Sequence, residues 1–300
     1  MKTTRKLLAL CAALGLLLCA LAPTAQAAGG SCATKYPIIL VHGAGFRDNN
    51  LLISYWGNIP KALKAQGAPV YFGNTDGWCS VENGAAALKK TVDQVLAKTK
   101  SEKVNIIAHS KGGLEARYMI SSLGMAGKVA SLTTIATPHQ GSKAMDIYLG
   151  WPRVLRQVIG AFGTAIRFIW GDKHPSFFQG TEALGTGQMK AFNQKNPNKA
   201  GVDYQSFAGA LHAPASDLIL CWPALLIRNV DGENDGMVTV ESAKWANFRG
   251  VLRGSGYRGV SHLDEVDFRR NDVAIQPLLG AKSIRSFYVA LAAELKQKGY

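Results

Sequence analysis

Residues 103–113, KVNIIAHSKGG, constrain the fold of this chain more than any other stretch. Residues 104–108 form a short, mostly apolar run between polar residues, which is typical of a strand buried on both faces of a sheet. The residues after Gly113 have apolar positions at helical spacing. A serine, Ser110, therefore lies where a buried strand turns sharply into a helix.

This turn has the pattern A-H-S-K-G, in which Ala108 replaces the first glycine of the G-x-S-x-G nucleophile elbow. The elbow requires small residues two before and two after the serine because the backbones nearly touch there. The pattern predicts Ser110 as a nucleophile. The alternative is an ordinary strand-to-helix turn that happens to contain a serine.

Apolar strands alternate with amphipathic helices along the rest of the chain. We expect strands over residues 36–43, 69–72, 104–108, 129–136, 202–208 and 223–230, and helices over 50–66, 82–98, 114–124 and 283–298. This alternation predicts an α/β fold with a mostly parallel, doubly wound sheet. Ligands of such sheets bind at the carboxyl ends of the strands, where His42, Ser110 and residues 137–139 fall.

Residues 145–188 interrupt this alternation with many large apolar side chains, few charges and several glycines. We interpret them as one or two helices that form a cap over the site, although a pair of core helices would give the same composition. The cap interpretation is favoured because the segment directly follows a strand that ends at the active face. A cap rich in apolar side chains suits an apolar substrate.

The first 27 residues have the features of a secretory signal peptide. Basic residues are followed by an apolar run over 7–21, and Ala25-Gln26-Ala27 supplies a small-x-small cleavage pattern. The run is about fifteen residues long, shorter than the roughly twenty that span a bilayer, so we expect cleavage near Ala27 rather than a membrane anchor. We therefore expect a secreted or periplasmic protein whose residues 28–300 form one catalytic domain.

The chain has 34 Lys and Arg against 20 Asp and Glu, a net charge of +14. Its lysines are scattered and not interleaved with aromatic residues, so nucleic acid is not an expected partner. The charge favours a solvated basic surface, with affinity for anionic surfaces as the alternative. Cys32, Cys79 and Cys221 allow one disulfide in an exported protein, but the sequence does not select the pair, and it predicts no oligomeric state.

A serine nucleophile needs a base, and an acid that orients the base. In this architecture the order along the chain is serine, acid, histidine. Of the six histidines, His262 is the one that follows an acidic loop after a predicted late strand, and it lies in the glycine-rich segment 253–267. We therefore predict His262 as the general base; the alternative is a surface or packing histidine.

The acid is expected in the loop 231–236, DGENDG. Asp235 is preferred because Asn234 and Gly236 suit a tight turn, with Asp231 as its main rival. A simple polar turn is the alternative for the whole loop.

Two backbone amides are expected to stabilise the developing oxyanion. One is the amide of Lys111, directly after the nucleophile, and the other is that of Ala44, in the loop after the first strand. His42 is expected to be a structural hydrogen-bonding residue.

Five motifs, VHGAG, AHSKGG, TPHQGS, NDGMV and SHLDEVD, occur in this order across residues 36–267. Together they resemble those of bacterial secreted triacylglycerol lipases of the Pseudomonas, Burkholderia and Proteus type, within the α/β-hydrolase fold. The resemblance implies the same roles for Ser110, Asp235, His262, Ala44 and Lys111. It also implies a mobile apolar lid between about residues 141 and 193.

The same resemblance implies a structural calcium near the catalytic histidine, with Asp264 and Asp217 as its candidate ligands. The chain departs from the family here, since Phe268 replaces a glutamine four residues beyond Asp264. The loop after His42 is also one residue shorter than usual, HG-x-G-F, and the disulfide of the Pseudomonas-type enzymes has no counterpart. No cofactor is expected for the chemistry itself.

These observations predict a secreted serine ester hydrolase, a lipase or carboxylesterase, that cleaves triacylglycerol or other apolar esters through an acyl-enzyme on Ser110. The expected partners are the lipid or other apolar ester substrate and, transiently through the lid, a lipid interface. The alternatives are a short-chain or polyester esterase, an acyltransferase that uses the same acyl-enzyme, and a non-catalytic surface-binding protein.

Overall fold

The computed structural model describes residues 30–45, 54–169 and 172–300. The predicted signal peptide, Phe46 of the HG-x-G-F loop and the start of the predicted helix 50–66 lie outside these residues.

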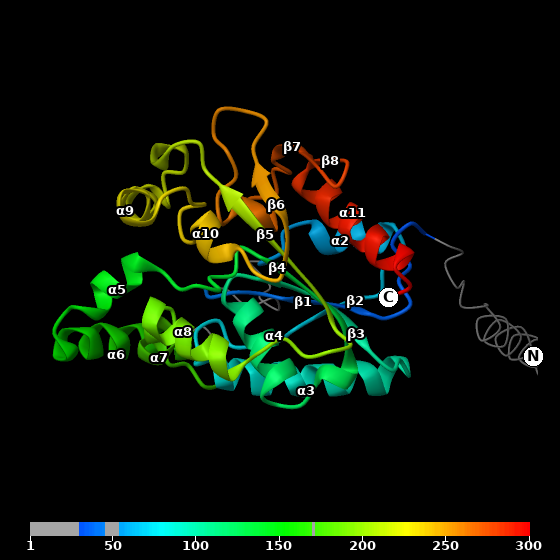
Figure 1. Cartoon of the computed structure of the whole chain (residues 1–300), viewed down its shortest axis with the longest axis horizontal. Coiled ribbons are helices and arrows are strands. Elements are labelled where there is room, and N and C mark those ends of the chain that lie inside the picture. Colours follow the sequence, from blue (N-terminus) through cyan, green and yellow to red (C-terminus); the bar gives the residue numbers. More distant parts are fainter. Residues whose placement is uncertain (1–29, 46–53, 170–171) are drawn as a thin grey trace, which may run out of the picture.

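A six-stranded parallel sheet forms the centre of the molecule, with the strand order β2-β1-β3-β4-β5-β6 (Figure 1). The strands are β1 (Ile38–Val41), β2 (Val70–Phe72), β3 (Val104–His109), β4 (Val129–Ile135), β5 (Asp203–Ala210) and β6 (Asn247–Arg253). Strands β1, β3 and β4 are buried along their whole length. The predicted parallel sheet is therefore confirmed.

Helices cover both faces of the sheet. Helices α3 (Val81–Thr99) and α4 (Lys111–Ser121) lie on one face, while α2 (Ile59–Ala65) and α11 (Ile284–Gln297) lie on the other (Figure 1). Side chains alternate between the faces along each strand, so Ile39 packs in the α3–α4 core and Ile38 in the α2–α11 core. This two-sided burial explains why the central strands have no polar face.

Two predicted elements differ from the structure. Residues 223–230, predicted as a strand, belong to helix α9 (Cys221–Asp231), in which Ala224 and Ile227 are buried at helical spacing. A short apolar run fits either element, and Pro223 is tolerated because the first helical turn needs no amide donor there. The sixth strand of the sheet is β6, where no strand was predicted. The helix predicted over residues 50–66 is shorter in its described part, where only α2 (Ile59–Ala65) is helical.

The described residues between β4 and β5 form the helices α5 (Lys143–Leu149), α6 (Arg153–Ile169), α7 (Phe177–Glu182) and α8 (Thr186–Lys195). They lie at the same end of the molecule as α9, and α5 packs against α9 (Figure 1). Val154 and Val158 on α6 are 71% and 62% exposed, so the alternative of a core helix pair does not hold.

The remaining elements are short. They are helix α10 (Val240–Ala243), the antiparallel pair β7 (Ala274–Leu278) and β8 (Ala281–Ser283), and the 3-10 turns Ala126–Lys128, Pro214–Ser216 and Asp264–Val266. Cys32, Cys79 and Cys221 are free cysteines. Within the described ranges, no helix has the length and apolar character needed to cross a membrane.

Candidate active site

Ser110 lies between the end of β3 and the start of α4. Its backbone has φ 54° and ψ −134°, a conformation that residues other than glycine rarely adopt. Two neighbours fix this turn. The Ser110 amide donates to the carbonyl of Ile135 at 2.9 Å, and the Thr137 hydroxyl donates to the Ser110 carbonyl at 2.7 Å. A backbone of this kind persists only where its surroundings hold it, and such strain gathers at functional sites.

Glycines allow the loop after β1 to touch this turn. A Cβ on Gly112 would lie 2.4 Å from the carbonyl oxygen of His42, and one on Gly43 would lie 2.6 Å from Cβ of Ser110. Ala44, next to Gly43, is therefore held close to the serine. Lys111 is the first residue of α4, so its amide has no acceptor within the helix. The two predicted oxyanion donors thus belong to segments that meet at Ser110.

His262 and Asp235 are in direct contact. The Nδ1 atom of His262 lies 2.8 Å from Oδ2 of Asp235, and the His262 amide donates to the Asp235 carbonyl at 2.9 Å. The other carboxylate oxygen accepts the amides of Met237 and Val238, both at 2.8 Å. The rival acid, Asp231, instead ends α9 and pairs with Lys143 at 3.0 Å.

The histidine–aspartate pair lies beside the elbow. The ring of His109, the residue before Ser110, is centred 4.4 Å from the ring of His262. Nδ1 of His109 lies 2.7 Å from the Tyr55 hydroxyl, and Nε2 lies 2.8 Å from Oε2 of Glu265. His109 therefore joins the elbow to the loop that carries His262.

This network is buried, and burial controls its charge. The pKa of Glu265 is raised well above its usual value by burial and by the nearby charge of Asp235, and its Oε1 atom is buried without a hydrogen-bond partner. The pKa of His109 is lowered well below its usual value by burial and by proximity to His262. Burial thus favours the neutral form of each group. In these forms the Tyr55 hydroxyl can donate to Nδ1 of His109, and the Nε2–H of His109 can donate to Glu265.

Other histidines near the strand ends have structural partners. Nδ1 of His42 lies 2.8 Å from the Gly43 carbonyl, and Nε2 lies 3.1 Å from that of Thr75, in agreement with its predicted role. His139 stacks on Trp245 and its Nε2 lies 2.9 Å from the Thr134 hydroxyl.

Groups with metal-ligand chemistry occur at two places. Among the described residues, His109, His262 and Glu265 have ligand atoms within 4.8 Å of one another, and these are members of the network above. The candidate calcium ligands Asp217 and Asp264 both contact the guanidinium of Arg269.

The Lys111 side chain is buried and pairs with Glu115.

The chain is similar to known lipases over most of its length. It is 31% identical over 266 residues to triacylglycerol lipase 2 of Saccharomyces cerevisiae, covering 84% of this chain and 76% of that protein. It is 30% identical to a triacylglycerol lipase of Burkholderia plantarii, covering 86% of each. The chain belongs to the triacylglycerol lipase family.

Two further comparisons agree. Residues 37–177 match the family described as palmitoyl protein thioesterase. The structure of Staphylococcus hyicus lipase is similar with a TM-score of 0.66 at 17% identity, covering 88% of this chain and 96% of that one. The structural similarity confirms the predicted α/β-hydrolase fold. The lipase relatives confirm the prediction of a lipase or carboxylesterase.

Sequence analysis did not assign a role to three members of this lipase's buried network, Tyr55, His109 and Glu265. Glu265 could have been noticed, since it stands three residues after His262 in SHLDEVD. The contact of Tyr55 with His109 spans 54 residues and leaves no local pattern in the sequence.

The raised pKa of Glu265 predicts a specific pH dependence of stability. The folded chain holds this proton more tightly than the unfolded chain, so the free energy of unfolding should fall as pH rises from about 4 through the folded-state pKa. Glu265→Gln cannot ionise and should lose this component. The free energy of unfolding of Glu265→Gln minus that of the wild type, measured by urea denaturation, should therefore increase as the pH is raised from about 4 to about 8. Glu241→Gln, at an exposed ion pair, is the control, and parallel curves for the wild type and Glu265→Gln would contradict the prediction.

Proposed function

We propose that this lipase is a secreted serine ester hydrolase that cleaves triacylglycerol or other apolar carboxylic esters through an acyl-enzyme on Ser110. The observation that carries the proposal is the 2.8 Å contact between His262 and Asp235 beside the elbow that presents Ser110. It supplies a base with a fixed tautomer beside the strained turn that carries Ser110.

In the first half of the reaction, the Ser110 hydroxyl attacks the ester carbonyl while His262 takes its proton. Asp235 orients the imidazole and stabilises its charged form. The amides of Ala44 and Lys111 donate to the oxyanion, and His262 returns the proton to the departing alcohol. Water, deprotonated by His262, then attacks the acyl-enzyme and releases the fatty acid and the free serine.

The preference for apolar esters is supported by two helical faces. Helix α6 and the turn before it expose Trp151, Val154, Leu155 and Val158, and α9 with the turn before it exposes Leu218, Ile219, Trp222, Leu225 and Leu226. Monomeric soluble proteins rarely expose contiguous apolar surface of this kind without a binding role. We propose that α5 and α6, within the lid 141–193, act together with α9 at a lipid interface.

Both ends of the lid are attached to the core. The hydroxyl of Ser242 on α10 donates to the carbonyl of Gly141 at 2.6 Å, at the start of the insertion, and Arg117 on α4 donates to Asn193 at 2.8 Å, at its end. Such an arrangement allows α6 to move while its flanks stay fixed.

Labelling with an organophosphonate ester tests the nucleophile. The reagent should modify one serine, which peptide mapping should identify as Ser110, and Ser110→Ala should lose both labelling and at least roughly 1000-fold of the hydrolysis rate. Modification of another residue would refute the site. Added alcohol acceptors in the same assay separate hydrolysis from acyl transfer.

Substitutions on the exposed helices test the lipid interface. Trp222→Ser and Val158→Ser should each lower the rate on emulsified long-chain glycerides by roughly tenfold, because each removes an apolar anchor, and should leave the rate on a soluble short-chain ester unchanged. Tyr36→Ser, at a partly exposed aromatic residue before β1 and so at the opposite end of the sheet, is the matched control. Equal losses on both substrates would argue for a short-chain esterase with no interfacial step.

Secretion is supported by the charge and hydropathy pattern of residues 1–27. Expression of the full chain in a bacterial host should give a protein outside the cytoplasm whose first residue, by N-terminal sequencing, is near Ala28. A cytoplasmic protein that keeps Met1 would show that the segment is not a signal peptide.

A further inference from the structure

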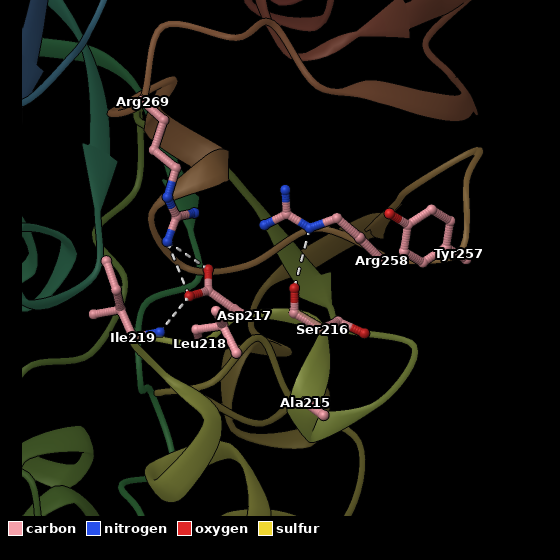
Figure 2. A pocket seen from close by; sticks show the side chains of 8 residues that line it. All are labelled: Ala215, Ser216, Asp217, Leu218, Ile219, Tyr257, Arg258 and Arg269. Atoms are coloured by element: carbon pink, nitrogen blue, oxygen red, sulfur yellow. Dashed lines mark hydrogen bonds and ion pairs between the residues drawn. The ribbon is translucent and has the colours of Figure 1, made fainter.

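The guanidinium of Arg269 lies between two buried carboxylates. Its Nη2 atom is 2.7 Å from Oδ2 and 2.9 Å from Oδ1 of Asp217, and its Nη1 atom is 3.0 Å from Oδ1 of Asp264. The two aspartates are 1% and 2% exposed. Figure 2 shows Arg269 reaching the carboxylate of Asp217.

Each carboxylate also holds a segment of functional importance. Asp217 accepts the amides of Ile219 at 3.1 Å and Leu220 at 3.3 Å, where helix α9 begins. Asp264 accepts the amide and hydroxyl of Ser261, at 3.2 and 2.9 Å, directly before His262. Arg269 therefore connects the start of the apolar helix α9 with the turn that carries the proposed base.

We propose that Arg269 is a positioning residue that fixes the His262 turn against the start of α9, and that it takes the place of the calcium ion implied at Asp264 and Asp217. Calcium takes six to eight oxygen ligands at about 2.3–2.6 Å, and here a guanidinium occupies the space between the two carboxylates. Phe268, in place of the family's glutamine, packs against the hydrophobic core and supplies no oxygen from its side chain. The residues present do not fit a calcium site.

Electrostatics explain why one arginine suffices. A guanidinium presents several donors in a fixed plane, so it can serve two carboxylates at once, whereas an ammonium acts as a point charge. Burial by itself would raise the pKa of Asp217, but the hydrogen bond and the charge of Arg269 help to hold this pKa below its usual value. Without Arg269, two buried carboxylates would lack their countercharge.

The first test concerns the metal and does not depend on activity. A hollow of about 540 Å³ beside the cluster gives ions and chelators access. The Tm of the wild type should be the same in excess EDTA and in excess CaCl2. A Tm that falls in EDTA and recovers with calcium would overturn the proposal.

The second test concerns positioning, and it rests on the proposed function. On a soluble short-chain ester, Arg269→Gln should lower kcat roughly 10- to 100-fold at unchanged KM, because a misplacement of about 1 Å of the base has effects of this size. The matched control is Arg249→Gln, which removes an arginine of similar exposure that pairs with Glu294 away from this turn, and it should leave kcat within about twofold. Equal kcat values for the two variants would overturn the positioning role.

Arg269→Lys keeps the test decisive if the glutamine variant does not fold. It retains the charge but cannot bridge both carboxylates. Its Tm should therefore lie closer to that of the wild type than the Tm of Arg269→Gln does, while its kcat should still be lowered. A wild-type kcat in this variant would overturn the bridging claim. If the wild type itself hydrolyses no ester, the proposed function fails, while the calcium test of Tm still decides whether Arg269 replaces the metal.

Discussion

The strained turn at Ser110 is the constraint on which the rest of the structure depends. A positive φ at a serine is unfavourable, so the neighbouring segments must hold it from several sides. Strand β4 accepts its amide, Thr137 donates to its carbonyl, and the backbone after β1 packs against Gly112. These contacts require β1, β3 and β4 to be adjacent in a parallel sheet, which places the loops after all three strands around one hydroxyl.

Burial of charge is the second organising factor. His109 and Glu265 share a hydrogen bond in a fully buried position, where a charged form of either would lack solvation. The pKa of Glu265 is accordingly raised and that of His109 lowered, so burial favours the neutral form of each. Asp217 and Asp264 are also buried, but their negative charge is compensated by the guanidinium of Arg269. Neutralisation by protonation and neutralisation by an internal cation thus occur on the two sides of one histidine turn.

The apolar surface follows from the same architecture. The insertion between β4 and β5 and the helix α9 both stand at the end of the sheet where the strands finish (Figure 1). Both expose leucine, valine and tryptophan side chains. Lys143 at the start of α5 pairs with Asp231 at the end of α9, so the two elements are joined at one point. Arg269 attaches the other end of α9 to the histidine turn. The start of α9 and the turn that carries the proposed base therefore share one ion-pair cluster.

The sequence by itself determined the alternation of strands and helices, the elbow at Ser110 and the identity of Asp235 and His262 as neighbours, because these depend on local patterns and on chain order. It did not determine that residues 221–231 are helical, since a short apolar run satisfies either period and only packing against α5 decides. Nor did it reveal the contacts of Tyr55 with His109 or of Arg269 with Asp217, which span 54 and 52 residues. Such pairs leave no spacing rule in the chain, so only the tertiary structure could bring them together.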